Sequence, residues 1–119
     1  MPSTRLNLVV IRVSDLEASA TFYSGLGLSL KKEQHGKGPE HYACDGDGVV
    51  FEIYPAHKDG SKVGPIRVGF EVPSLDDALA AVSSLGGKIV SQPKESAWAR
   101  RAVASDPDGN SVELLQRSV

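Results

Sequence analysis

The chain has 119 residues, of which 40% are hydrophobic and 24% are charged, and its formal net charge is -2. This length fits one domain with a modest core, and the near balance of charge excludes a strongly basic surface built for nucleic acid or an anionic membrane. No apolar run reaches the ~18 residues that a membrane span needs. Cys44 is the lone cysteine, which excludes an intrachain disulfide and fits a reducing compartment, so we expect a cytoplasmic protein.

An internal repeat organises the sequence. The segment VVIRVSDLE at 9–17 matches VGFEVPSLD at 68–76, an offset of 68 − 9 = 59, and DGDGVVFEI at 45–53 matches DPDGNSVEL at 106–114, an offset of 106 − 45 = 61. Two ordered matches at nearly one offset predict two copies of one unit. Within a single domain of residues 1–119, we place the first unit at about 5–55, a linker at 56–64 and the second unit at about 65–117.

Each copy predicts the same order of elements, strand, helix and three strands. Ser14 is the expected N-cap of the first helix, with Glu17 completing a capping box, and Ser74 is the expected N-cap of the second. The expected strands lie at 6–13, 28–35, 40–45 and 49–54 in the first copy, and at 66–72, 87–92, 99–105 and 111–116 in the second. The predicted fold class is α+β, with two tandem βαβββ units that form a curved mixed sheet around a concave cavity.

Two carboxylates stand out in the final strand of each unit. A helix covers only one face of its sheet, so the other face needs the second copy or another chain. Strand alternation places Glu52 and Glu113 on that other face, at the same point of each repeat. A buried unpaired carboxylate is costly, so these residues should meet a cation, a metal or water. The alternative is a wet face that carries two ordinary exposed acids.

Several motifs resemble the vicinal oxygen chelate superfamily, which includes glyoxalase I, the extradiol dioxygenases and the bleomycin resistance proteins. The opening motif is VSDLEAS at 13–19, followed by Phe22-Tyr23 and Leu26-Gly27-Leu28, and the closing motif is DPDGN at 106–110, followed by Glu113-Leu114. The resemblance covers about residues 6–117 and is specific for the fold, whereas the fold hosts many chemistries. It also implies a homodimer.

The resemblance further implies four metal-ligand positions on the concave faces, a His or Gln early in the first strand of each unit and a Glu in the last. Glu52 and Glu113 match the last-strand positions, but Leu8 and Arg67 occupy the first-strand positions. Leucine cannot bind a metal, and arginine offers only donors. We therefore expect no catalytic divalent metal, and a bidentate contact between Arg67 and a carboxylate in its place. A water-rich metal held by the two carboxylates alone is the alternative.

His41 and Tyr54 are further candidates for the first unit. If the first hairpin has a two-residue turn, His41 shares a face with Glu52, and it could then replace a lost ligand, act as a base or pair with Glu52. A three-residue loop would reverse this, and the plain alternative is a histidine at a strand edge. Tyr54 shares the face of Glu52 and could line the cavity or its rim.

The second unit offers Trp98, Arg100 and Arg101 near the start of its hairpin. Trp98 could cover an apolar ligand while an arginine, Arg100 foremost, holds an anionic group. The alternative is that Trp98 packs a loop and the arginines are solvated.

The expected function is therefore the binding of a small-molecule ligand in the cavity, without a catalytic metal, as in the bleomycin resistance proteins. The alternative is a divalent-metal-dependent lyase, isomerase or dioxygenase of the glyoxalase type, with Glu52 and Glu113 as its metal-binding and catalytic residues.

Overall fold

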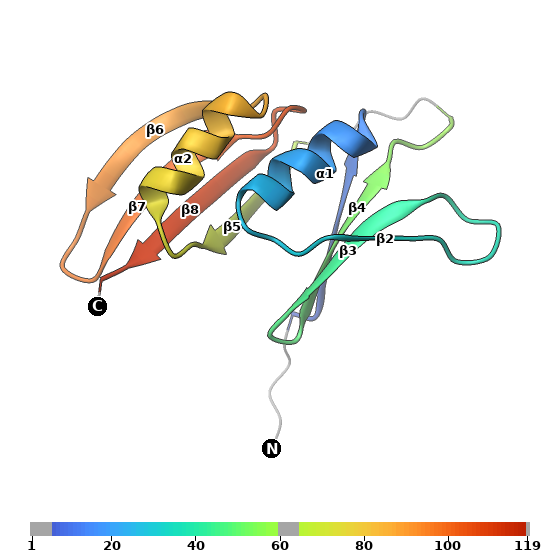
Figure 1. The fold of residues 1–119 in the computed structure, drawn as a ribbon, viewed down its shortest axis with the longest axis horizontal. Coiled ribbons are helices and arrows are strands. Elements are labelled where there is room, and N and C mark those ends of the chain that lie inside the picture. Colours follow the sequence, from blue (N-terminus) through green and yellow to red (C-terminus); the bar gives the residue numbers. More distant parts are fainter. Residues whose placement is uncertain (1–5, 60–64, 119) are drawn as a thin grey trace, which may run out of the picture.

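The computed structural model describes residues 6–59 and 65–118, and these form two sheets with one helix each (Figure 1). The first unit contains β1 (Leu8–Val13), α1 (Leu16–Gly25), β2 (Lys31–Glu33), β3 (His41–Gly46) and β4 (Val49–Pro55), and the second contains β5 (Arg67–Glu71), α2 (Leu75–Ser84), β6 (Lys88–Glu95), β7 (Ala99–Ser105) and β8 (Ser111–Arg117). This order confirms the predicted βαβββ repeat. Within the described residues, neither helix is long enough to cross a membrane. Residues 60–64 of the expected linker lie outside the described residues.

The two sheets have the same topology. The strand order is β1-β4-β3-β2 in the first sheet and β5-β8-β7-β6 in the second, so β2 and β6 lie at the outer sides of the molecule (Figure 1). In each sheet the first and last strands of the unit pair in parallel, and the remaining pairs are antiparallel. The duplication detected in the sequence is therefore a duplication of the whole sheet-and-helix unit.

The first hairpin has the two-residue turn that fixes the side of His41. Gly46 pairs with Val49, and the residues between them are Asp47 and Gly48, with φ angles of 50° and 87°. Two successive residues with positive φ fit the right-handed twist of a hairpin, and Asp-Gly adopts them readily. The register then pairs Ala43 with Glu52, so His41 lies on the same face as Glu52.

The first helix is capped one residue later than the sequence predicts. Asp15 is the N-cap, and its side chain accepts a hydrogen bond from the backbone N–H three residues on, at 3.0 Å. Ser14 does not cap α1, because its hydroxyl donates to Asp108 of the second unit instead. Glu17 completes no capping box, because it pairs with a lysine of β2 and accepts a hydrogen bond from a tyrosine of β3. Ser74 caps α2 as predicted.

The helix-side faces of the two units meet in a shared core. Phe51 and Phe70 contact each other edge to face at 5.4 Å, and the ring of Tyr23 lies 5.3 Å from Phe51 and 5.9 Å from Phe70. The buried hydroxyl of Tyr23 donates to Asp106 at 2.7 Å. Burial, together with the charge of Asp106, raises the pKa of Tyr23 above its ordinary range. Helix α1 therefore contacts the second unit through apolar packing and through a hydrogen bond to a charged carboxylate.

The closing motif at 106–110 forms a network of hydrogen bonds that stabilises the second hairpin and connects the two units. The carboxylate of Asp106 accepts hydrogen bonds from the backbone N–H groups of Asp108 and Asn110, each at 2.9 Å. The side-chain oxygen of Asn110 accepts from the N–H of Ile66 at 2.9 Å, just before β5. Asp108 accepts from the backbone N–H of Ser14 at 3.2 Å, at the start of α1. These residues orient the second hairpin, and they join the two units instead of forming a ligand site.

Candidate functional site

Each sheet has one face that its own helix does not cover, called here its open face. Strand alternation assigns the residues to these faces. The open face of the first unit carries Leu8, Val10, Arg12, Glu33, His41, Ala43, Val50, Glu52 and Tyr54. The open face of the second unit carries Arg67, Gly69, Glu71, Arg101, Val103, Ser111, Glu113, Leu115 and Arg117. The predicted pair Glu52 and Glu113 thus lies on the expected faces, one on each sheet.

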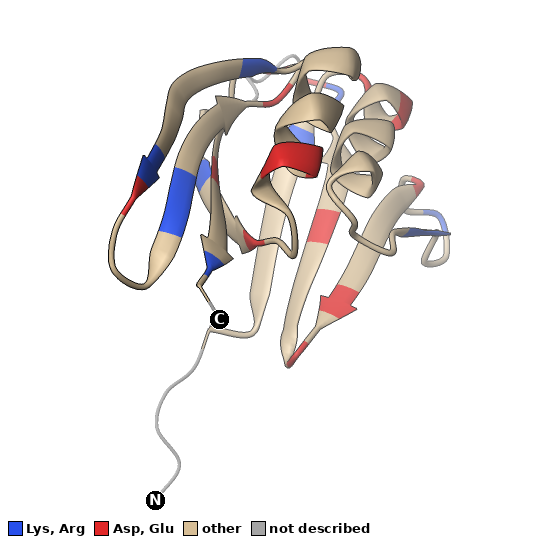
Figure 2. Ribbon diagram, turned by 60° about the vertical axis from the view of Figure 1, so that its left-hand side comes forward, with Lys and Arg blue, Asp and Glu red and all other residues tan. Residues whose placement is uncertain are grey.

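Two guanidinium groups hold Glu113. Arg67 Nη2 donates to Glu113 Oε1 at 3.3 Å, and Arg101 Nη1 lies 3.4 Å from the same oxygen. The predicted contact between Arg67 and a carboxylate is present, but it is not bidentate. Arg67 pairs with Ser111, one pleat away from Glu113, so its guanidinium reaches the carboxylate diagonally. Other Lys and Arg segments lie on the strands of this unit, on the left of Figure 2.

Glu52 has a different environment. It lies between Val10 and Ala43 on the neighbouring strands, and its side chain forms no hydrogen bond or ion pair within residues 6–59 and 65–118. The cavity of about 430 Å³ beside it is lined by Ser29, Lys31, Glu33, Ala43, Cys44, Asp45, Val50 and Glu52. All of these belong to the first unit, so this cavity of a single chain does not bring Glu52 and Glu113 together.

His41 is a buried residue of an inner strand. Its side chain is 1% exposed, because its ring stacks on Tyr54 with 4.2 Å between the ring centroids and 7° between the planes. The guanidinium of Arg12 lies 5.1 Å from the centre of the same tyrosine ring and donates to the Pro55 carbonyl at 3.1 Å. His41 therefore lies at the first position of β3 and is buried, and His41 and Tyr54 are packed side by side on the open face.

The arginine that joins Glu113 is Arg101, not Arg100. Arg100 pairs with Gln116 on the helix side of the sheet, where it forms ion pairs with Asp76 at 3.5 Å and Glu95 at 3.3 Å. Arg101 alternates to the open face. The second hairpin has a five-residue loop, and a sequence prediction with that loop length would place Arg101 on the same face as Glu113.

Trp98 is exposed in the turn between β6 and β7. The guanidinium of Arg117 lies 5.9 Å from the centre of its ring, and Arg117 also pairs with Glu71 at 2.9 Å. A small cavity of about 170 Å³ lies against Trp98, Arg101 and Leu115. The tryptophan thus stands next to open-face residues of the second unit, where a bound molecule could reach it.

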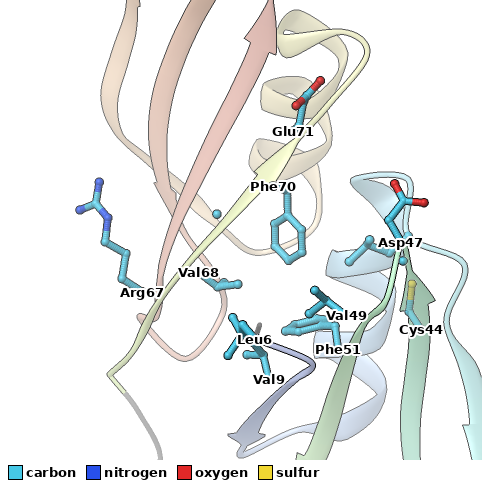
Figure 3. A pocket seen from close by; sticks show the side chains of 13 residues that line it. Leu6, Val9, Cys44, Asp47, Val49, Phe51, Arg67, Val68, Phe70 and Glu71 are labelled. Carbon is cyan, nitrogen blue, oxygen red and sulfur yellow. The ribbon is translucent and has the colours of Figure 1, made fainter. Parts of the chain in front are cut away.

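A larger cavity, of about 560 Å³, lies between the two units on their helix sides (Figure 3). Most of its lining is apolar, and Val9, Phe51 and Phe70 extend into it from β1, β4 and β5. Asp47, Arg67 and Glu71 also line it, and Arg67 points away. Neither Glu52 nor Glu113 lines it. This cavity continues the shared core of the two units.

A divalent metal at the four repeat-equivalent positions does not fit the donors present. Leu8 has no donor atom, Arg67 is a cation, and Glu113 is already neutralised by two guanidiniums. Only Glu52 remains as a free ligand, whereas protein sites for transition metals use three or four donors. The chemistry available on the open faces is ion pairing, hydrogen bonding and aromatic stacking.

Comparison with known proteins agrees with this architecture. The model of the Glyoxalase/Bleomycin resistance protein/Dioxygenase superfamily matches residues 5–114. An uncharacterized protein of Mycolicibacterium smegmatis is 31% identical over 94% of this chain and 93% of its own length. A probable lactoylglutathione lyase of Vibrio parahaemolyticus is 29% identical over 98% of this chain and 93% of its own length.

Solved structures show the same fold. The crystal structure of an antibiotic binding protein from a Streptomyces species has a TM-score of 0.73 and 26% identity, and the match covers 99% of each chain. The family match covers most of the chain and the repeated units account for its architecture. The chain therefore belongs to the glyoxalase/bleomycin resistance protein/dioxygenase superfamily.

Proposed function

We propose that this protein binds a small molecule between open faces and does so without a catalytic metal. The observation that carries the proposal is the pairing of Glu113 with Arg67 and Arg101, at 3.3 and 3.4 Å. This pairing satisfies the charge that a metal would otherwise satisfy. The likeness to an antibiotic binding protein supports a binding role. Cys44 is a free thiol, in keeping with the cytoplasmic location that we propose.

The ligand should be a flat, largely apolar molecule with an acidic group. Arg67, Arg101 and Arg117 face two carboxylates on the second open face, which leaves one guanidinium charge in excess. Trp98 adds an exposed aromatic surface beside them. Guanidinium groups bind carboxylates, sulfonates and phosphates, and aromatic side chains stack on planar rings.

A second copy of the chain is part of the proposal. Leu8 and Val10 on the first open face are 47% and 40% exposed, although both belong to β1 and pair with residues of β4. In a homodimer, the first open face of one protomer would cover the second open face of its partner. Glu52, Tyr54 and these apolar residues would then face the arginines across one cavity.

The fluorescent dye anilinonaphthalene sulfonate tests this proposal, because it is aromatic, apolar and anionic. We expect saturable binding, and we expect Arg101→Gln to weaken it by roughly tenfold, since a charge-assisted contact contributes about 1.5–3 kcal/mol. Arg100→Gln is the matched control, because Arg100 lies on the helix side with its own acids. Equal affinity for all three proteins would contradict the proposed face.

The alternative function keeps Glu52 and Glu113 as metal ligands of a glyoxalase-type lyase, isomerase or dioxygenase. The similarity to a probable lactoylglutathione lyase favours it. The discriminating measurement is lactoylglutathione lyase activity with and without added Ni²⁺ or Zn²⁺. Activity that depends on the metal and disappears in Glu113→Gln would replace the binding function with the enzymatic one.

A further inference from the structure

Three potential metal ligands converge at the outer part of the first unit, away from the four family positions. Glu33 ends β2 and pairs with His41 across the β2–β3 ladder, and His35 follows two residues later. Glu33 Oε1 lies 3.5 Å from the Nε2 atom of His35 and 3.5 Å from that of His41. One donor atom from each of the three residues lies within 4.8 Å of the other two.

These distances suit a small transition-metal ion. With metal–donor bonds of about 2.0–2.1 Å, a tetrahedral site places its donor atoms about 3.3 Å apart. The two 3.5 Å separations therefore need to shorten only slightly on binding. Two imidazoles and one carboxylate are a donor set that favours Zn²⁺, Ni²⁺, Co²⁺ or Cu²⁺ over Mg²⁺ and Ca²⁺, and they leave a coordination position for water.

His41 is already oriented as a ligand. Its Nδ1 lies 3.2 Å from the carbonyl oxygen of Pro39, which can only accept, so this contact favours the neutral tautomer with the proton on Nδ1 and the Nε2 lone pair directed to the cluster. Metal-bound histidines characteristically make this second hydrogen bond. Stacking on Tyr54 fixes the plane of the ring.

The buried Nε2 atom of the same histidine is also unsatisfied. His41 is 1% exposed, and its Nε2 has no hydrogen-bond partner among the described residues. A buried polar atom without a partner costs free energy, and a bound cation would remove that cost. Access is open, since His35 is 74% exposed and its ring lies 5.1 Å from that of His41. We propose that Glu33, His35 and His41 form a site for one divalent transition-metal ion, with Zn²⁺ as the reference ion.

Zn²⁺ titration of chelator-treated protein that carries no histidine tag tests the site by isothermal titration calorimetry. We expect one ion per chain, and we expect His35→Ala and Glu33→Gln each to weaken binding at least about tenfold. Both positions are solvent-accessible, so these variants spare the buried His41. His57→Ala is the matched control, because His57 is the remaining histidine of the chain and is exposed outside the cluster. Co²⁺ in place of Zn²⁺ should give the visible absorption of a tetrahedral ion.

The outcomes separate this site from the family positions. Absence of Zn²⁺ uptake, or equal uptake by the wild type and His35→Ala, would overturn the proposal and leave the dye-binding result unaffected. Uptake that survives His35→Ala and disappears in Glu113→Gln would place the ion at the family site. That result would overturn both this site and the metal-free binding function.

Discussion

At the scale of single residues, two positions of this chain depart from the metal-binding pattern that the family resemblance implies. Many members of its superfamily use a divalent metal, and the resemblance assigns the ligand positions of the first strands to Leu8 and Arg67. Arg67 goes further than removing a donor, because its guanidinium contacts the neighbouring carboxylate at 3.3 Å. The acid that would bind a metal is thereby converted into one half of an ion pair.

Restoring the ligands should restore a metal site. The double variant Leu8→His, Arg67→His would supply two imidazoles beside Glu52 and Glu113, a complete set of four donors. We expect it to gain about one Ni²⁺ or Zn²⁺ per cavity, measured by native mass spectrometry in a His35→Ala background that removes the peripheral cluster. The gain should vanish on adding Glu113→Gln. No gain in metal binding would show that the four positions do not converge in the assembled protein.

At the scale of elements, the duplication predicts most of the fold, because turn residues and helix caps that are visible in the sequence determine where most elements begin and end. The Asp-Gly turn sets the register of the first hairpin, and that register places His41 beside Glu52. The N-cap of α1 was predicted one residue early, because Ser14 is used in a contact between units that no local pattern reveals. Arg101 was missed as a partner of Glu113 because the length of the second hairpin loop decides its face.

The cluster of Glu33, His35 and His41 could not be predicted from the sequence, for a related reason. Its members come from β2, the segment after it and the start of β3, and the loop between those strands has no pattern that fixes their distance. The pairing of Glu33 with His41 is visible only from the strand register. Sequence patterns thus locate residues on faces, whereas convergence across a loop depends on the folded chain.

The burial of Tyr23, together with its contact with Asp106, should make the stability of the protein depend on alkaline pH. The pKa of Tyr23 is raised in the folded protein, so its contribution is complete below the unfolded value of about 10 and is lost as pH rises beyond it. While the folded tyrosine keeps its proton, the free energy of unfolding should fall by about 1.4 kcal/mol per pH unit. Urea denaturation from about pH 9 to about pH 11 would show this component.

Tyr23→Phe is the matched variant for this measurement. It should lose about 1.5–3 kcal/mol at neutral pH, because the hydrogen bond to a charged carboxylate is removed. Above about pH 10 the variant should lose less stability than the wild type, because it lacks the contribution of Tyr23. The other tyrosines and lysines still contribute in both proteins. Parallel pH profiles for the two proteins would show that Tyr23 ionises equally in the folded and unfolded chains.

At the scale of the whole molecule, the units meet through their helix sides and leave the open faces without a partner. The apolar cavity of about 560 Å³ lies on the inner side, whereas Glu52 and Glu113 lie on the faces that the helices do not cover. Two apolar residues of β1 remain exposed on such a face. The arrangement of a single chain therefore favours completion of the ligand cavity by a second copy.

Val10→Lys tests that completion. The lysine would stand opposite Glu52 in the parallel register, so the charge pair should preserve the folded protomer, whereas burial of the lysine in an interface would be costly. We expect the dimer to dissociate at least about tenfold more readily, measured by sedimentation equilibrium. Val90→Lys makes the same change at an exposed valine of β6 and should leave association unchanged. Equal association of both variants would place the dimer interface elsewhere.

The separation of Glu52 from Glu113 within one chain has a thermodynamic consequence. When a cavity exists only between two protomers, ligand binding and protomer association are linked, and each strengthens the other by the same factor. Apparent ligand affinity should then fall as the protein is diluted below its dissociation constant, and saturating ligand should hold the dimer together at those dilutions. The cellular abundance of such a protein would set how tightly it retains its ligand.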